Sequence, residues 1–527
     1  MNTVHEPAGA PRTRHHKIWV GLGIVLLAIA ATVFITLQVV VHRATPILKE
    51  RVVRTLSQHL DSRVELDQLQ VSVLHGLNVS GSGLRVYPND EAIASGAHAP
   101  LITIARFDFH ADLAGLFFRP MRVGAVYVRG LAITIPPRQH GEKRTASKPK
   151  IGKADFEIGD LICDDSRLII ESSKPDKDPH IFLLKHIVLH DIGRGTASMY
   201  DATLTNAVPP GEIHAIGSFG PWNTESPGDS NVDGNYTFEH ADLNAIHGIG
   251  GMLHSVGGYQ GQLDRIDVHG TVDVPNFSLD TANHPLPLST RYTATVDGTS
   301  GDTYLHSIDA RLVDSNFTCK GSVVDIKGKG HVIDIDVDVP AGRMQDFLAL
   351  SVKKSPPPMT AVIRTKAHLH IDPGQERVVE RLGLRGRFEL RFIHFTNPEI
   401  EDKVDMMSLR AEGKPKEAKP GAPDVHSRMT GSFDADKGVM RIRDLVYELP
   451  GATVDLAGQY SLDGKDFDFT GKVRTKAEIS DMVASKWKSI LLKPVDPFFK
   501  KHGAGAEIPI KITGTGDQPH VGFHLGG

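Results

Sequence analysis

Hydrophobic and polar residues alternate along much of this chain. In the stretch GHVIDIDVDVP, residues 330–340, four aliphatic residues alternate with three aspartates: Ile333, Ile335, Val337 and Val339 with Asp334, Asp336 and Asp338. Successive side chains of a β-strand point to opposite faces, so this pattern predicts a strand with one apolar face and one wet face.

The three aspartates also invite interpretation as a metal site. A calcium loop of the EF-hand type needs a Gly after its spaced acids and a Glu at its twelfth position. Val339 stands where that Gly belongs and Gln345 where the Glu belongs. A strand with one solvent-exposed face is therefore the better interpretation. Its aliphatic face must then be covered by another part of the protein or by a ligand.

The same alternation recurs with turn signals about every 8–12 residues, which predicts antiparallel β-meanders. Clear examples are RIDVHGTVDV (265–274), GRFELRF (386–392), KDFDFTGKV (465–473) and IPIKITGTG (508–516). The predicted fold is mainly β, with few short helices. An elongated β domain is expected over 63–409 and a C-terminal β region over 425–527.

The N-terminal part has a different pattern. Residues 18–41 contain no charge and are long enough to cross the ~30 Å hydrocarbon core of a bilayer as one helix. A cleaved signal peptide is the alternative, because Ala28 and Ala30 form an A-x-A, but the apolar run continues well past them. We predict a tail over 1–17, a transmembrane helix over 18–41 and an amphipathic helix over 44–61.

Three stretches rich in Lys, Pro and Ala predict solvated loops: 136–153, 172–179 and 410–424, the last of them a flexible linker or loop. Near the C-terminus, Ser480 is a good N-cap, and a helix is expected from Ser480 to Lys493, before Pro494. The apolar stripe of this helix consists of Val483, Trp487, Ile490 and Leu491.

Composition and motifs argue against several classes of function. The net charge is only −4 and no basic stripe carries interleaved aromatics, so nucleic acid is not expected as a partner. No nucleophile-elbow, zinc-protease or P-loop motif occurs. The spaced histidines His240, His247 and His254, and the pair His368 and His370, lack a completing ligand at recognisable spacing. We expect no enzyme activity, no cofactor and no metal.

Cys163 and Cys319 lie far apart in the sequence, which fits neither a disulfide framework nor a zinc pattern. One bridge between them and two free buried thiols both remain open.

Several stretches resemble the AsmA-like family, part of the AsmA/TamB superfamily of bacterial envelope proteins. The opening after the apolar segment (47–86) is similar, as are 111–137 and the Gly-punctuated strands of 257–280. The strongest similarity is C-terminal, in RMTGSFDADKGVMRIRDLVYELPGATVDLAGQYSLDGKDFDFTGKV (428–473) and in 486–525. The resemblance covers most of the chain, and its motifs are structural rather than catalytic.

The resemblance implies a long curled antiparallel β-sheet whose apolar groove carries lipid, as in the bridge-like lipid transfer proteins. It further implies a single-pass anchor in the bacterial inner membrane, a large domain in the periplasm, and a role in phospholipid transport toward the outer membrane or in its homeostasis. Phospholipid is the expected ligand. The groove residues expected on this basis are Ile266, Val268, Val272, Val274, Ile333, Ile335, Val337, Val339, Phe388, Leu390, Phe392, Phe467, Phe469, Ile508, Ile510 and Ile512.

The same pattern also permits a closed core in place of an open groove, with a different function. The apolar faces could cover each other as an ordinary sandwich or β-helix core. In that case a non-enzymatic scaffold for the assembly of outer-membrane proteins, acting through exposed strand edges, is the competing function.

The C-terminal segment is the expected docking element. The stripe of Val483, Trp487, Ile490 and Leu491, followed by Phe498 and Phe499, lies among lysines and suits a membrane interface or an envelope-protein partner. The alternative is a cap that packs on the last strands and protects their edge.

Overall fold

The computed structural model describes residues 49–523 except 51, 55, 58–61, 73–76, 88–98, 112–120, 137–155, 173, 194–195, 208, 222–226, 424, 463–465, 486–504 and 515–518. The protein is mainly β, with 66% strand and 11% helix. No helix among these described residues is both long and apolar enough to span a bilayer. The predicted membrane segment 18–41 lies outside them.

The chain divides into two compact units. The first comprises residues 1–133, 151–165 and 189–195, and the second 134–150, 166–188 and 196–527. Two strands, β5 (Phe156–Ile170) and β6 (His180–Ile192), contribute residues to both.

In the first unit, consecutive strands pair antiparallel, β1 with β2, β2 with β3, and β3 with β4. These strands are β1 (Val64–Ser72), β2 (Leu77–Val86), β3 (Ile102–Ala111) and β4 (Met121–Ile135), the last two residues of which belong to the second unit. Helical residues 49–50, 52–54 and 56–57 fall within the predicted amphipathic helix 44–61.

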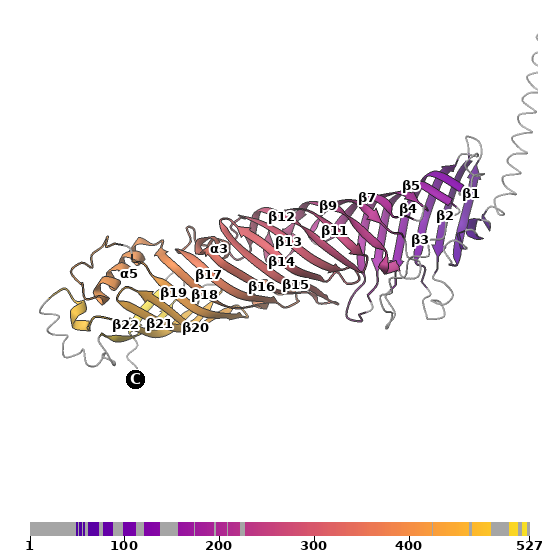
Figure 1. Ribbon diagram of the computed structural model, residues 1–527. Coiled ribbons are helices and arrows are strands. Elements are labelled where there is room, and N and C mark those ends of the chain that lie inside the picture. Colours follow the sequence, from indigo (N-terminus) through magenta and orange to yellow (C-terminus); the bar gives the residue numbers. More distant parts are fainter. Residues whose placement is uncertain are drawn as a thin grey trace, which may run out of the picture. The chain divides into compact units, whose positions relative to one another are not determined.

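In the second unit, each strand from β7 to β24 pairs antiparallel with the next, apart from the two-residue β10, which pairs with β12. Figure 1 shows these strands side by side in chain order. They are β7 (Ser198–Ala207), β8 (Pro210–Phe219), β9 (Asn231–Asp242), β10 (Ile249–Gly250), β11 (Met252–Gln262), β12 (Arg265–Leu279), β13 (Leu286–Asp297), β14 (Thr303–Leu312), β15 (Ser315–Ile326), β16 (Gly330–Arg343), β17 (Met359–Ile371), β18 (Leu382–Phe395), β19 (Arg428–Asp436), β20 (Val439–Leu449), β21 (Ala452–Ser461), β22 (Phe467–Thr475), β23 (Glu507–Gly514) and β24 (Pro519–Phe523).

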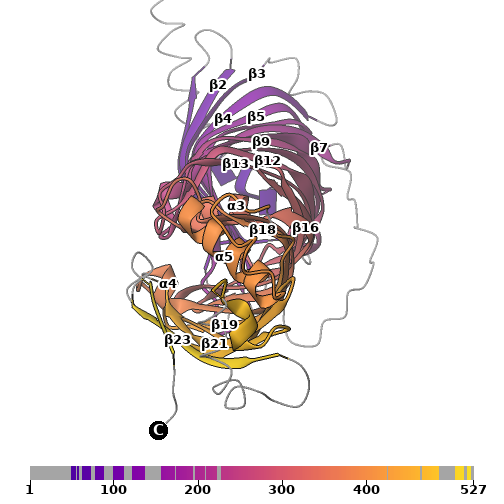
Figure 2. The same cartoon turned by 90° about the vertical axis from the view of Figure 1, so that its left-hand side faces the viewer.

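A few short helices interrupt these strands. They are η2 (Pro227–Asp229), η3 (Leu243–Ala245), α3 (Met344–Ser351), α4 (Val378–Arg381), α5 (Pro398–Ala411) and η4 (Ile479–Met482). Helix α5 begins at a well-formed N-cap. The Asn397 side chain accepts a hydrogen bond from the Glu399 amide at 2.9 Å, and Pro398 occupies the first turn. In the end-on view of Figure 2 the strands of the second unit bend along an arc, with α3 and α5 on its inner side.

The three aspartates of β16 lie on the polar side of the sheet. Each contacts a cationic or titratable side chain of the neighbouring β17: Asp334 meets His370 at 3.1 Å, Asp336 meets His368 at 3.0 Å and Asp338 meets Lys366 at 2.8 Å. These cross-strand pairs hold the register of two strands whose other faces are apolar.

The helix predicted from Ser480 is wrong at its start. Ser480 lies inside the short turn η4 and is buried, and Val483 has extended backbone, with φ −108° and ψ 129°. Glu478, which precedes the turn, makes no capping hydrogen bond through its side chain. Ser480 is therefore inside the turn and not at its cap, and the extended backbone of Val483 ends the turn after Met482. Residues 486–493 lie outside the described part.

The stretch 172–179 has no regular structure where it is described, as expected for a loop, but it is not solvated throughout. Lys177 is only 6% exposed and forms an ion pair with Asp302. A buried partner carboxylate has therefore drawn a lysine of this loop into the interior. Of the other two predicted loops, 137–153 lies outside the described residues. The stretch 410–424 lies in the connection between β18 and β19, two strands that pair with each other.

Candidate functional site: an apolar sheet face

One face of the second unit's sheet is apolar from its first strand to its last. Residues directly opposite each other on paired strands point to the same face, so the registers define continuous rows of side chains. We call one of them the central row, with one residue from each strand from β7 to β24 except β10. It consists of Ala202, Ala215, Tyr236, Gly257, Gly270, Tyr292, Ile308, Cys319, Val337, Ala367, Gly386, Phe433, Ile442, Gly458, Phe469, Ile512 and Val521.

No residue of the central row carries a charge. The face that contains this row, called the apolar face below, also holds most of the predicted groove residues. These are Ile266, Val268, Val272 and Val274 on β12, Ile333, Ile335, Val337 and Val339 on β16, Phe388 and Leu390 on β18, Phe469 on β22, and Ile508, Ile510 and Ile512 on β23. The structure thus brings together residues that the sequence predicted only strand by strand.

Helices cover part of this face. Val339 and Leu390 are buried in a core cluster that also includes Ala411 of α5, and Phe347 of α3 packs against that cluster. The Phe347 ring lies edge-on to Phe317 of β15, with centroids 6.0 Å apart. This part of the apolar face is an ordinary packed core.

Elsewhere on the face, aliphatic side chains are only half-buried. Ile266, Val268, Val272, Ile333 and Ile335 belong to this group, and all five lie outside the core cluster. On the opposite face of these strands Asp267, His269, Asp273 and Asp336 are exposed, so the faces remain distinct. The half-buried rows leave apolar surface that a ligand could cover.

Tyrosines and glycines form two further regular features on the apolar face. In each of two rows, two tyrosines on outer strands flank two glycines on the strands between them: Tyr200, Gly217, Gly234 and Tyr259 in one row, and Tyr236, Gly257, Gly270 and Tyr292 in the other. In both rows the two hydroxyl groups meet above the glycines. We call these the tyrosine–glycine rows.

The glycines are required by this arrangement. A Cβ atom at Gly234 would lie 2.8 Å from the Tyr259 hydroxyl and 3.0 Å from that of Tyr200. A Cβ at Gly270 would lie 3.0 Å from the Tyr236 hydroxyl. Only glycine therefore lets the rings lie low over the strands instead of standing away from them.

The tyrosine hydroxyls are satisfied within the protein. Tyr236 contacts the Ser255 hydroxyl at 2.9 Å, and Ser255 donates to the Thr271 carbonyl at 2.9 Å. Tyr200 donates to the Asp233 carbonyl at 3.4 Å. Burial raises the pKa of Tyr200, Tyr259 and Tyr292 above the ordinary tyrosine value, so these groups stay neutral. The rows therefore add polar atoms to the apolar face without adding charge or an unmatched donor.

Sequence reasoning missed these rows, although a signal was present. Both β9 and β11 carry the pattern G-x-Y, as Gly234 with Tyr236 and Gly257 with Tyr259. Antiparallel pairing in the observed register places each tyrosine opposite the other strand's glycine. The pattern becomes meaningful only once that register is known.

Phe392 is a correction to the predicted groove residues. It has a left-handed backbone, with φ 55°, and its side chain is 54% exposed and packs edge-on against His426. The pairing of β17 with β18 shifts register beside it, as at a β-bulge. The bulge moves the alternation by one residue, so Ile393, only 2% exposed, is buried in the core cluster instead.

Other predicted residues fall partly outside the described part. The backbone of Phe467 pairs with Gly514, but its side chain is not among those described. Of the predicted docking residues only Val483 is described. Trp487, Ile490, Leu491, Phe498 and Phe499 lie outside the described residues, so the docking prediction stays a prediction.

The two cysteines and the described histidines were the remaining candidates for a reactive or metal-binding centre. Both cysteines are free, and burial raises the pKa of Cys163 to about 12 and that of Cys319 to about 11. Such thiols are poor nucleophiles near neutral pH. In the part of the chain that the structure describes, no three His, Cys, Asp or Glu side chains are placed to hold a metal ion.

Comparison with known proteins gives no match of any kind: no family model, no curated protein and no solved structure is similar to this chain.

Proposed function

We propose that the protein shields lipid acyl chains on its apolar face, as an inner-membrane-anchored protein of the bacterial periplasm that serves phospholipid transport toward the outer membrane or homeostasis of that membrane. The observation that carries the proposal is the uncharged central row, which crosses every strand from β7 to β24 except β10. An ordinary core needs apolar residues only where another layer covers them, whereas this face continues where its aliphatic side chains are half-buried.

The energetics favour a continuous apolar path. Exposing acyl chains to water costs about 0.8 kcal/mol per CH₂ group, or roughly 12 kcal/mol for one sixteen-carbon chain. An acyl chain lying against residues such as Ile333 and Ile335 would bury much of that surface. Because the face continues from strand to strand, a lipid could move along it without returning the chain to water.

The tyrosine–glycine rows fit the same function. Rings that lie low over glycines project less far from the sheet than upright side chains would. Because the hydroxyls are paired with one another or with nearby backbone, an acyl chain passing over them leaves no donor newly unsatisfied. These rows would continue the path between the more aliphatic strands.

The membrane anchor, the periplasmic location and membership of the AsmA-like family rest on the sequence alone. The apolar segment 18–41 would hold the chain in the inner membrane, and the C-terminal segment with Trp487 and Phe498 would contact a membrane or a partner in the envelope. Neither segment lies among the described residues.

Photocrosslinking from opposite faces of one strand tests the proposal. A photoreactive amino acid is placed at Ile335, on the apolar face, or at Asp336, on the polar face, in the full-length chain in living bacteria labelled with radioactive phosphate. We expect a phospholipid adduct from position 335 and not from position 336. Positions 268 and 269 on β12 provide a second matched pair, because Val268 lies on the apolar face and His269 on the polar one.

Equal labelling from both faces, or no lipid adduct from 335 and 268 in correctly folded protein, would overturn the proposal. Adducts to protein alone at these positions would instead favour the scaffold function. As a functional check, Val268→Asp, which lies nearer the anchor along the sheet, should abolish the adduct at position 335 and leave a folded chain. Loss of folding in that variant, with no lipid adduct from the unsubstituted chain, would identify the face as a closed core.

A further inference from the structure

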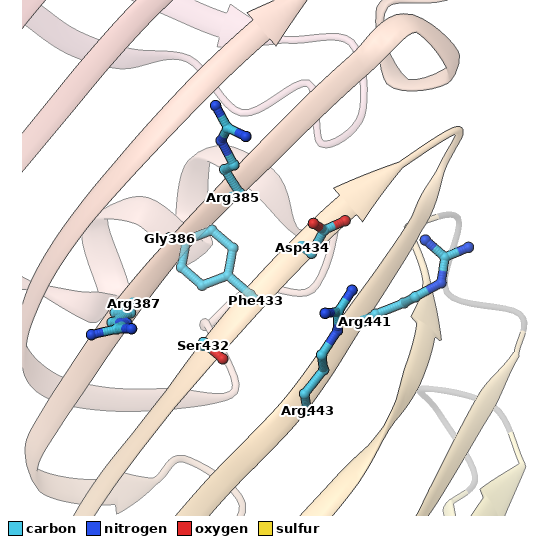
Figure 3. Close-up of a pocket in the computed structure, with 8 residues that line it drawn as sticks. All are labelled: Arg385, Gly386, Arg387, Ser432, Phe433, Asp434, Arg441 and Arg443. Atoms are coloured by element: carbon cyan, nitrogen blue, oxygen red, sulfur yellow. The ribbon is translucent and has the colours of Figure 1, made fainter.

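Four arginines gather on the polar side of the sheet, around a hollow of about 320 Å³. Arg385 and Arg387 come from β18, and Arg441 and Arg443 from β20. We call these four residues the arginine cluster. Figure 3 shows their side chains spread around Ser432 and Asp434 of the intervening strand β19.

Strand alternation sets this grouping. Gly386, Phe433 and Ile442 belong to the central row and therefore mark the apolar face. Each arginine of the cluster is directly adjacent in sequence to Gly386 or Ile442, so its side chain points to the opposite, wet side. All four are exposed. The arginine side chains thus lie on the side opposite the apolar face, and the hollow between them is also lined by Gly386 and Phe433 of the central row.

The charges of the cluster are poorly balanced. Among the described residues, none of its four arginines lies within ion-pair distance of a carboxylate, whereas two other arginines of β18 and β19 are paired: Arg391 and Arg428 both contact Glu389, at 2.6 and 2.8 Å. Asp434 is the one carboxylate that lines the hollow. Asp444 on β20 accepts a hydrogen bond from the Ser432 amide at 2.7 Å and partly balances the charge of the nearby Arg387, so two carboxylates face four guanidinium groups.

Like charges gathered on β18 and β20, on either side of β19, repel each other, and an anion between them would reverse that effect. Guanidinium groups present paired N–H donors that match two oxygens of a phosphate, which a single carboxylate such as Asp434 cannot supply to all four. The Ser432 hydroxyl lines the same hollow. A ligand with several phosphate oxygens is the chemical group that fits this arrangement best.

We propose that the arginine cluster is a binding site for phosphate groups of an anionic ligand. This site does not depend on the apolar face carrying lipid. The phosphate could belong to the headgroup of an anionic lipid or to a soluble phosphate compound, and the two sources share the same recognition chemistry.

Calorimetric titration of the purified full-length chain in amphipol tests the site with two probes, sodium pyrophosphate and monomeric dihexanoyl phosphatidic acid. The variants are Arg385→Gln/Arg441→Gln and Arg387→Gln/Arg443→Gln. The matched control is Arg391→Gln/Arg428→Gln, which removes the same charge from arginines that are already paired. Equal melting temperatures establish that the cluster variants fold like the parent chain.

We expect at least one probe to bind, each cluster variant to weaken that binding about tenfold or more, and the control to leave it nearly unchanged. Binding should also weaken with added NaCl. If only the lipid probe binds in an arginine-dependent way, the ligand is a lipid headgroup. If only pyrophosphate does so, the ligand is a soluble phosphate compound. The proposal is overturned if neither probe binds, or if the control variant weakens binding as much as the cluster variants do.

Discussion

Lys177 and Asp302 form an ion pair in the interior of the second unit, with 2.7 Å between Nζ and Oδ1. The lysine side chain is 3% exposed and that of the aspartate 2%. Lys177 also donates to the Asp325 carbonyl, and the Asp325 amide donates to Asp302 at 3.0 Å. The pair thus ties the segment before β6 to the ends of β14 and β15.

Lys177→Ala should destabilise the second unit by about 3 kcal/mol, because it leaves the buried carboxylate of Asp302 with only the half-exposed Lys174 within ion-pair distance, at 3.6 Å. Lys185→Ala, also in the second unit, is the matched control. Its side chain is 64% exposed and lies 3.1 Å from Glu212, so its removal should cost less than about 1 kcal/mol. Urea unfolding of both variants measures the difference, and equal losses would contradict a structural role for Lys177.

The free energy of unfolding should depend on pH through the ionisation of Asp302. Burial would raise the pKa of this carboxyl, but hydrogen bonds from Lys177, the Asp325 amide and Ser300 outweigh it and hold the pKa below the ordinary value of 3.8. A lowered pKa stabilises the folded state above the unfolded-state pKa, and this contribution is lost as pH falls through the folded-state pKa.

Asp302→Asn should therefore be less stable than the parent chain at neutral pH, with the gap narrowing as the pH falls below about 3.8. Unfolding midpoints in denaturant, taken from pH 7 to pH 2.5, measure the gap. A gap that stays constant over this range would show that the ionisation of Asp302 makes no contribution.

The bulge in β18 predicts opposite outcomes for two adjacent residues. Ile393→Ala should destabilise the protein by about 2–5 kcal/mol, because it leaves a cavity in the core cluster. Phe392→Ala removes a larger side chain that is 54% exposed, so its effect should be much smaller. Thermal and denaturant unfolding compare the two. The reverse order would show that Phe392, not Ile393, points into the core.

Substituting a glycine of the tyrosine–glycine rows should displace the tyrosine rings above it. Gly234→Ala places a Cβ atom 2.7 Å from the Ile216 carbonyl oxygen and 2.8 Å from the Tyr259 hydroxyl, and should destabilise the protein by about 1–3 kcal/mol through overpacking. Gly383→Ala on β18 is the control, because its Cβ would meet its nearest neighbours at 3.7 Å, an ordinary contact. Urea unfolding measures stability, and the tyrosine near-ultraviolet circular dichroism should change only for Gly234→Ala. Equal behaviour of the two variants would contradict the low ring position.

The sequence by itself determined the class of the fold and the division of each strand into two faces. Alternation such as that of residues 330–340 is a local property, because every second side chain of a strand points the same way whatever its neighbours are. Gly-rich turns at short intervals likewise implied antiparallel neighbours. The same reasoning placed most predicted groove residues on strands and on a single face of each.

Only the tertiary structure decided which residues share a row. Register depends on pairing between strands, so the central row and the meeting of Tyr200 with Tyr259 are invisible in one strand's pattern. A single residue with positive φ moved Phe392 to the wet side and Ile393 to the core, and a distant carboxylate drew Lys177 out of solvent. These outcomes depend on contacts between segments far apart in sequence, which local propensity does not encode.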